Sequence, residues 1–184
     1  MKKSDLFTKI MPYLVDYKLY RWFGKSGFQP MTLTYSVTAA CQSRCKTCQI
    51  GAMFCQDPTR PEKDLRLDEI EKIFKSMKPV YFFNMSGGEP FLRKDLPEIV
   101  ALACKYLKPR VIHTPTNAIL SDRIIEKTEQ ILNVIREYDP TVPFTVKPSI
   151  DGVGELHDEI RGVKVLFSTL NDALFFTLNG AVSA

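Results

Sequence analysis

After residue 30, the chain alternates between two patterns of hydrophobic and polar residues. Short apolar runs of six to eight residues are each followed by a longer stretch in which apolar residues recur every three or four positions. The short runs predict β-strands, and the longer stretches predict helices with one buried face. The four predicted strands cover residues 31–38, 80–85, 110–115 and 144–150.

Four helical stretches follow these runs. The first three have apolar faces centred on Ile70, Ile99 and Ile131, and the last is predicted over residues 158–178. The segment 52–64 lacks a helical pattern and is predicted to be a loop insertion. Strands that alternate with amphipathic helices indicate an α/β fold with a parallel sheet and right-handed crossovers. The predicted fold is a partial (β/α) barrel of about four β/α units.

The first 30 residues have a different pattern. They predict an amphipathic basic helix and a linker, and residues 31–184 form the main domain. The helical spacing is carried by Phe7, Ile10, Met11, Leu14 and Tyr17. Such a helix either covers the open end of the domain, which we favour, or lies on a membrane surface.

Length and charge restrict the architecture and the partners. The 184 residues suit one domain and fall short of the roughly 250 residues of a complete (β/α)8 barrel. The net charge of +4 comes from the first 30 residues, and the rest of the chain has 19 residues of each sign. A nucleic-acid-binding protein would have a basic face across its fold, so we expect no nucleic-acid partner.

No apolar stretch approaches the 18 or so residues of a membrane span, and the apolar start is interrupted by charges before a signal peptide could form. We therefore expect a cytoplasmic protein without a transmembrane segment. In that compartment, the five cysteines are expected to be reduced thiols, metal ligands or core residues. Cys104 falls on an apolar helical face, which predicts a core position.

Polar residues and cysteines follow each predicted strand, where ligands bind in parallel α/β folds. Cys41, Cys45 and Cys48 follow the first strand with the spacing Cys-x3-Cys-x2-Cys. Three thiolates on one loop can hold three corners of a cubane iron–sulfur cluster and leave the fourth iron open to a ligand. Alternatively, Cys55 supplies a fourth ligand and closes a zinc, redox or iron–sulfur site.

The cysteine loop resembles the cluster motif of the radical S-adenosylmethionine (SAM) superfamily. Gly87-Gly88-Glu89-Pro90 resembles the family's Gly-Gly-Glu motif, which binds the methionine amino group of SAM. Three later segments are also similar to family motifs, although Ala118 stands where glycine is usual. They are Thr114–Asn117, Ser149–Gly152 and His157–Gly162, and the last two point to the peptide-modifying and cofactor-building branch.

The resemblance implies that Cys41, Cys45 and Cys48 hold a [4Fe-4S] cluster. It also implies SAM binding, and the residues that match the family's cofactor-binding positions are Thr47, Gly87, Gly88, Glu89, Asn117, Ser149, Asp151 and Arg161. Thr47 stands where many members have an aromatic residue that packs on adenine. Without the resemblance, Ser149 and Asp151 would suggest a capped turn, and Arg161 a surface ion pair with Asp158.

The implied activity is reductive cleavage of SAM to a 5′-deoxyadenosyl radical that abstracts hydrogen from a peptide or small-molecule substrate. A small flavodoxin- or ferredoxin-like protein is the expected electron donor. The family's core has six β/α units, so the sequence predicts a C-terminally truncated core or a second chain that completes the barrel. Two alternatives to an enzyme remain open: a non-catalytic Fe–S or zinc-binding module, and a regulatory fragment of a longer radical SAM protein.

Overall fold

A computed structural model describes residues 3–24 and 30–164 of the chain. Within this part, four parallel strands form one sheet in the order β1-β2-β3-β4. The strands are β1 (Thr32–Thr38), β2 (Phe82–Gly87), β3 (Val111–Thr116) and β4 (Phe144–Pro148). The sheet is open, as expected for a partial (β/α) barrel, and the α/β prediction is confirmed.

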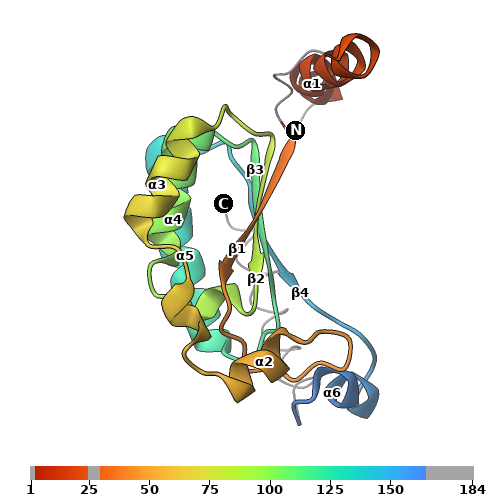
Figure 1. Cartoon of the computed structure of the whole chain (residues 1–184), viewed down its shortest axis with the longest axis vertical. Helices are drawn as coiled ribbons and strands as arrows, with labels where there is room; N and C mark the ends of the chain where they lie inside the picture. Colours follow the sequence, from red (N-terminus) through yellow and green to blue (C-terminus); the bar gives the residue numbers. More distant parts are fainter. Residues whose placement is uncertain (1–2, 25–29, 165–184) are drawn as a thin grey trace.

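One layer of helices covers one face of this sheet (Figure 1). They are α3 (Leu67–Ser76), α4 (Leu96–Leu102) with its extension η3 (Ala103–Leu107), and α5 (Ser121–Tyr138). Strand residues Val37, Phe83, Met85 and Ile112 are buried against them, and the helices contribute a larger set of buried apolar residues. That set is Ile70, Phe74, Leu96, Ile99, Val100, Ala103, Leu107, Ile124, Ile131 and Ile135.

Most of the predicted helical faces are therefore buried, with one exception. Ile73, three positions after Ile70, is expected on the apolar face of α3 but is 43% exposed, because it lies to one side of the buried Ile70 and Phe74. Cys104 packs partly buried against the core, as predicted, and burial raises the pKa of its thiol to about 11.

The prediction of a loop insertion over residues 52–64 was partly wrong. This segment contains most of α2 (Ile50–Gln56) and all of η1 (Arg60–Lys63). At the other end of the chain, α6 (Glu155–Arg161) begins earlier than predicted and ends at Gly162 in a left-handed conformation. The rest of the long helix predicted over 158–178 lies outside the described residues from 165 onward. The remaining short element is η2 (Pro90–Leu92).

The predicted N-terminal helix is present as α1 (Lys3–Phe23). It contacts the domain through Tyr13, whose ring packs edge-on against Tyr81 and whose hydroxyl donates to the Pro79 carbonyl at 3.4 Å. Leu14 and Tyr17, three positions apart, lie on one face of α1, as predicted, and exposed Val15 and Leu19 lie on another. Apolar side chains of α1 are thus not confined to the predicted face.

Helix α1 lies at the amino-terminal end of the strands, and the loops after the strands lie at the other end (Figure 1). It therefore does not cover the end of the sheet at which the cysteine loop begins. None of the helices in the described part of the chain combines the length and apolar character needed to cross a membrane.

Candidate functional site

The cysteine loop leaves the end of β1 and leads into α2, and α6 lies next to it at the lower end of the molecule (Figure 1). Cys41 and Cys45 are half-buried, and Cys48 is exposed. Apart from a turn at Lys46 and Thr47, the loop has no regular structure of its own. Its shape therefore depends on the elements that contact it.

Three glycines from three different elements touch the backbone of this loop. A β-carbon at Gly51 of α2 would lie 1.6 Å from the Ser43 carbonyl oxygen. A β-carbon at Gly88 would lie 2.0 Å from the carbonyl oxygen of Ala40, and one at Gly162 would lie 2.5 Å from that of Arg44. Any larger residue at these positions would displace the loop.

The Gly-Gly-Glu turn joins the ends of three strands. The amides of Gly88 and Glu89 donate to the carbonyls of Thr38 and Ala40, at 2.8 and 2.7 Å, which fixes the turn against β1. The Glu89 side chain is 2% exposed. Its carboxylate accepts from the Thr116 hydroxyl at 2.9 Å and from the Asn117 amide at 2.7 Å, which fixes it against β3.

A third bond to the Glu89 carboxylate comes from the Phe91 amide at 3.2 Å. Burial raises the pKa of Glu89, and these hydrogen bonds and the nearby Arg161 charge act in the opposite direction. A carboxylate has about four acceptor positions, so three of them are used within the protein. Glu89 is thus mainly a link between strand ends, with little capacity left for a ligand.

At the end of β3, Asn117 faces the cysteine loop. Its side-chain nitrogen lies 4.0 Å from the Cys41 sulfur, and its side-chain oxygen accepts from the Ile119 amide at 3.1 Å. Ala118, which replaces the glycine usual in the family, has a φ of +60°. An L-residue in this conformation costs about 1 kcal/mol, so the turn keeps the glycine-like geometry despite the substitution.

At the end of β4, Asp151 and Arg161 bring α6 to the site. The Ser149 amide donates to the Thr116 carbonyl at 2.9 Å, and the Asp151 amide donates to Nδ1 of the buried His157 at 3.2 Å. Asp151 forms an ion pair with Arg161 at 2.7 Å, whereas the sequence suggested Asp158 as the ion-pair partner. Nη1 of Arg161 lies 3.6 Å from the Cys45 sulfur.

The thiols of the loop differ in their surroundings. Burial raises the pKa of Cys41, and the charges of Glu89, Cys45 and Cys48 act in the same direction, against a hydrogen bond from the Ser43 backbone. Cys45 has the positively charged guanidinium of Arg161 beside its sulfur. Asn117 after β3 and Arg161 at the end of α6 therefore face the cysteines, and the charge of Glu89 after β2 acts on Cys41.

The donor set fits a multi-iron cluster better than a single ion. Among residues 3–24 and 30–164, no three Cys, His, Asp or Glu side chains form a group that could hold one metal ion. Zinc needs its ligands about 2.0–2.3 Å from a single centre. A cubane cluster instead binds each cysteine at a different iron, which suits three thiols spread along one loop. Cys55, the alternative fourth ligand, is exposed on α2.

The structure brings most of the predicted site residues together at the strand ends. The loop cysteines, the Gly-Gly-Glu turn, Asn117, Asp151 and Arg161 form one connected network. Thr47 lies exposed in the turn of the loop, and the observed contact of Ser149 in this network is through its backbone.

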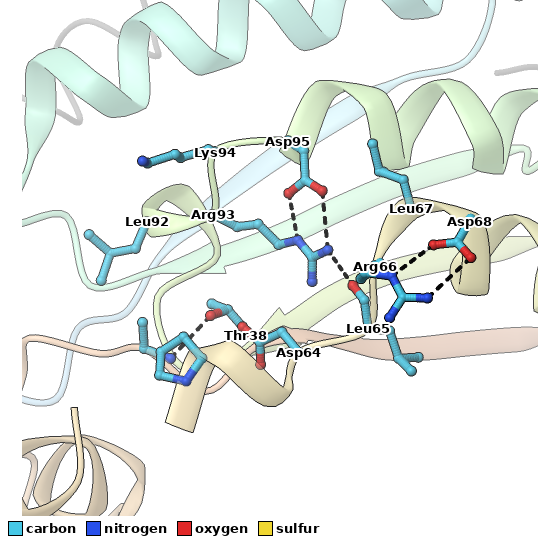
Figure 2. A pocket seen from close by; sticks show the side chains of 12 residues that line it. Thr38, Asp64, Leu65, Arg66, Leu67, Asp68, Leu92, Arg93, Lys94 and Asp95 are labelled. Atoms are coloured by element: carbon cyan, nitrogen blue, oxygen red, sulfur yellow. Dashed lines mark hydrogen bonds and ion pairs between the residues drawn. The ribbon is translucent and has the colours of Figure 1, made fainter. Parts of the chain in front are cut away.

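Apart from this network, a hollow of about 520 Å³ lies between the start of α3 and the segment from Leu92 to Asp95 (Figure 2). The largely buried Arg93 spans it, donating to the carbonyls of Val37 and Leu65 and pairing with Asp95 at 2.7 Å. Asp64 accepts from the Ala39 amide at 3.0 Å. Arg93 and Asp64 thus hold the end of β1 just before Cys41.

Sequence reasoning missed Arg93, Asp64 and Gly51. Gly51 has a signal only once α2 is known, since a glycine inside a helix then points to a close contact. Arg93 and Asp64 had none, because their partners are carbonyl and amide groups of distant segments.

Comparison with known proteins agrees with the family resemblance of the sequence motifs. Residues 35–172 match the family model described as the radical SAM superfamily. An Fe-coproporphyrin III synthase of Methanosarcina barkeri is 32% identical over 139 residues, which cover 73% of this chain and 31% of that protein. The mycofactocin maturase MftC of Mycobacterium tuberculosis is 30% identical, over 79% of this chain and 34% of that protein.

Among solved structures, Streptococcus suis SuiB bound to the precursor peptide SuiA is similar in fold, with a TM-score of 0.52 and 17% identity. That match covers 89% of this chain and 33% of SuiB. The chain spans about a third of the length of each of these proteins. The cofactors typical of the matched family are a [4Fe-4S] cluster and SAM. The extent of the family match shows that this chain belongs to the radical SAM superfamily.

Proposed function

We propose that the chain is the cluster- and SAM-binding part of a radical SAM enzyme. The observation that carries the proposal is the connected network at the strand ends, in which Asn117 lies 4.0 Å from the Cys41 sulfur and Arg161 3.6 Å from the Cys45 sulfur. Polar groups from β3 and α6 thus face the thiols, as a site that binds both a cluster and a polar ligand requires.

In this proposal, Cys41, Cys45 and Cys48 hold a [4Fe-4S] cluster and leave one iron without a protein ligand. Arg161 adds a positive charge beside the Cys45 sulfur, which balances part of the negative charge of a bound cluster. Asn117 supplies an amide group beside Cys41. Exposed Cys55 has no part in the site.

The Gly-Gly-Glu turn would bind the methionine ammonium of SAM. An ammonium only donates hydrogen bonds, and the amides of Gly88 and Glu89 already donate to β1 and the loop that follows it. Backbone carbonyls of residues 87–88 are therefore the natural acceptors, because the Glu89 carbonyl already accepts from the Leu92 amide at 3.0 Å, and the remaining acceptor position of the Glu89 carboxylate can add to them.

The other predicted cofactor-binding residues would complete the pocket. Ser149 and Asp151 offer polar groups at the end of β4, and Arg161 provides a positive charge for the SAM carboxylate. Thr47 stands at the position that faces adenine in the family and offers a small polar surface there. These roles rest on the family motifs and on the meeting of β3, β4 and the cysteine loop.

Given an electron, the bound cluster and SAM supply reductive cleavage of the sulfonium to methionine and a 5′-deoxyadenosyl radical, which abstracts hydrogen from a substrate. The substrate is a peptide or a small molecule. A flavodoxin- or ferredoxin-like protein supplies the electron, and a reducible cluster on free thiols fits a cytoplasmic location. Further chain or a second protein would extend the sheet beyond β4.

The test is an anaerobic assay for 5′-deoxyadenosine. The full chain is reconstituted with iron and sulfide and incubated with SAM and dithionite. We expect formation of 5′-deoxyadenosine and a change in the electron paramagnetic resonance spectrum of the reduced cluster when SAM is added. The Cys48→Ala variant should give neither signal, and the Cys55→Ala variant should match the wild type.

A cluster-loaded wild type that shows no spectral change with SAM would contradict the proposal. Loss of the cluster in Cys55→Ala would instead favour a closed, non-catalytic iron–sulfur module.

A further inference from the structure

The end of α6 runs along the cysteine loop and bonds to its backbone. The Arg44 amide donates to the Arg161 carbonyl at 3.1 Å, and the Lys46 amide donates to the Ile160 carbonyl at 2.8 Å. These two amides lie on either side of Cys45. Since the loop has almost no regular structure of its own, its central amides obtain their hydrogen bonds from a helix more than 100 residues later in the chain.

Gly162 makes this close approach possible. It ends α6 with a φ of +64°, and its amide donates to the Asp158 carbonyl. A β-carbon there would lie 2.5 Å from the Arg44 carbonyl oxygen and 2.9 Å from the Arg44 carbonyl carbon. These are backbone atoms, so a side chain at position 162 could be accommodated only by moving the loop and α6 apart.

Two side-chain contacts also join α6 to the cysteine loop. Arg161, whose side chain is 14% exposed, reaches from Asp151 to the Cys45 sulfur. Lys46 and Glu159 form an ion pair at 2.5 Å, but both side chains are more than half exposed. Exposed ion pairs contribute little to stability, so the backbone contacts and Arg161 account for most of the attachment of α6 to the loop.

We propose that the segment from Ile160 to Gly162, called here the α6 brace, holds the cysteine loop in the shape that the cluster needs. The inference rests on the proposed function, since it assumes that the loop binds a cluster. It assigns to Ile160 and Gly162 a positioning role that involves no contact with SAM. Cluster affinity would then depend on chain beyond β4, far from the cysteine motif.

The test compares two glycines that end helices. Gly24 and Gly162 have φ values of +60° and +64°, and each amide donates to the carbonyl four residues earlier. A β-carbon at Gly24 would meet nothing within 4 Å. Both Gly24→Ala and Gly162→Ala add the same backbone strain, but only the second separates α6 from the loop.

The first readout is iron bound per chain after anaerobic titration with iron and sulfide. We expect Gly162→Ala to weaken iron binding by about 10- to 100-fold, the usual range for groups that support metal ligands. Gly24→Ala and Glu159→Gln should stay within about twofold of the wild type, because the first is remote and the second removes only an exposed ion pair.

The second readout is amide hydrogen exchange in the apoprotein, which needs no cluster. In Gly162→Ala, the amides of Arg44 and Lys46 should exchange at least about tenfold faster, whereas the sheet amides of Met85 and Ile112 keep wild-type rates. Unchanged exchange at Arg44 and Lys46 in a folded variant would overturn the brace. Loss of protection at Met85 and Ile112 as well would also count against it, since the effect would be global unfolding.

The two proposals fail in different ways. A wild type that binds no cluster would refute the proposed function, while the exchange experiment would still report on the brace. A wild type and a Gly162→Ala variant that load iron equally well would refute the brace and leave the proposed function standing.

Discussion

The two ends of the sheet are built in different ways. At the carboxyl end, three glycine contacts hold the cysteine loop, a buried carboxylate links the end of β2 to β3, and an ion pair links α6 to the end of β4. At the amino end, α1 is attached through Tyr13, and Trp22 and Phe23 are 70% and 65% exposed. Backbone atoms in close contact fix positions within narrow limits, which a ligand site requires and a peripheral helix does not.

The largest difference between the ends should appear at Gly51. A glycine-to-alanine change inside a helix normally stabilises a protein by about 1 kcal/mol. At Gly51 the added methyl group meets the Ser43 carbonyl at 1.6 Å, so we expect a loss of about 3 kcal/mol and no cluster loading. Chemical denaturation and iron analysis check this. A stabilised Gly51→Ala variant that loads iron would show that the loop is not closely held.

Removing the charge of Glu89 should have the next largest effect. In Glu89→Gln, the amide NH2 must face a backbone donor, either Phe91 or Asn117, because each carboxylate oxygen now accepts from one of these amides. We expect a loss of about 2–3 kcal/mol in the free energy of unfolding. The matched change Glu98→Gln, on the exposed side of α4, should be close to neutral. Equal effects of the two changes would contradict the linking role of Glu89.

Cys104 gives a pH-dependent effect away from the site, in η3 just before β3. Burial raises its pKa from 9.0 to about 11, so the folded state holds the thiol proton more tightly than the unfolded state. The resulting stability is fully present below pH 9 and is lost as the pH rises toward 11. The advantage of wild type over Cys104→Ala should shrink by about 2 kcal/mol between these pH values.

Urea unfolding at pH 9 and pH 11 measures this change. Exposed Cys55 serves as the control, and the difference between wild type and Cys55→Ala should stay constant over the same range. A constant difference for Cys104→Ala as well would mean that Cys104 is not buried.

The smallest effect is expected at the amino end. Tyr13→Ala removes the edge-on contact with Tyr81 and the hydrogen bond to Pro79, and should cost about 1 kcal/mol. Cluster loading should not change, because the contact lies at the end of the sheet opposite the cysteine loop (Figure 1). Differential scanning calorimetry and iron analysis test both parts. A loss of iron binding in Tyr13→Ala would remove the distinction between the two ends.

Much of the fold could be predicted because each element has a local pattern. Parallel strands such as β2 are short apolar runs, and α5 buries Ile124, Ile131 and Ile135 at regular helical spacing. Residues 50–63 were harder to predict, since α2 and η1 are too short to repeat a pattern. The apolar spacing predicted the helix α1, but it did not predict the aromatic residues that lie on the other sides of this helix.

The sequence could predict which residues belong to the site better than it could predict the contacts between them. The cysteine spacing and Gly-Gly-Glu mark residues that lie together, and Gly88 makes the close backbone approach expected of it. The link from Glu89 to Thr116 and Asn117 and the contact of Arg161 with Cys45 join positions far apart in sequence. Such contacts depend on how strand ends meet in three dimensions, and no local pattern encodes them.

The central claim is that Cys41, Cys45 and Cys48, and no other cysteine, hold a cluster at the carboxyl end of the sheet. The most direct measurement is the iron and sulfide content of anaerobically reconstituted wild type and of the five single cysteine-to-alanine variants. We predict close to the four iron atoms of one [4Fe-4S] cluster in wild type, Cys55→Ala and Cys104→Ala, and a loss of the cluster in each of the three loop variants. A full cluster in any loop variant, or its loss in Cys55→Ala, would contradict the account.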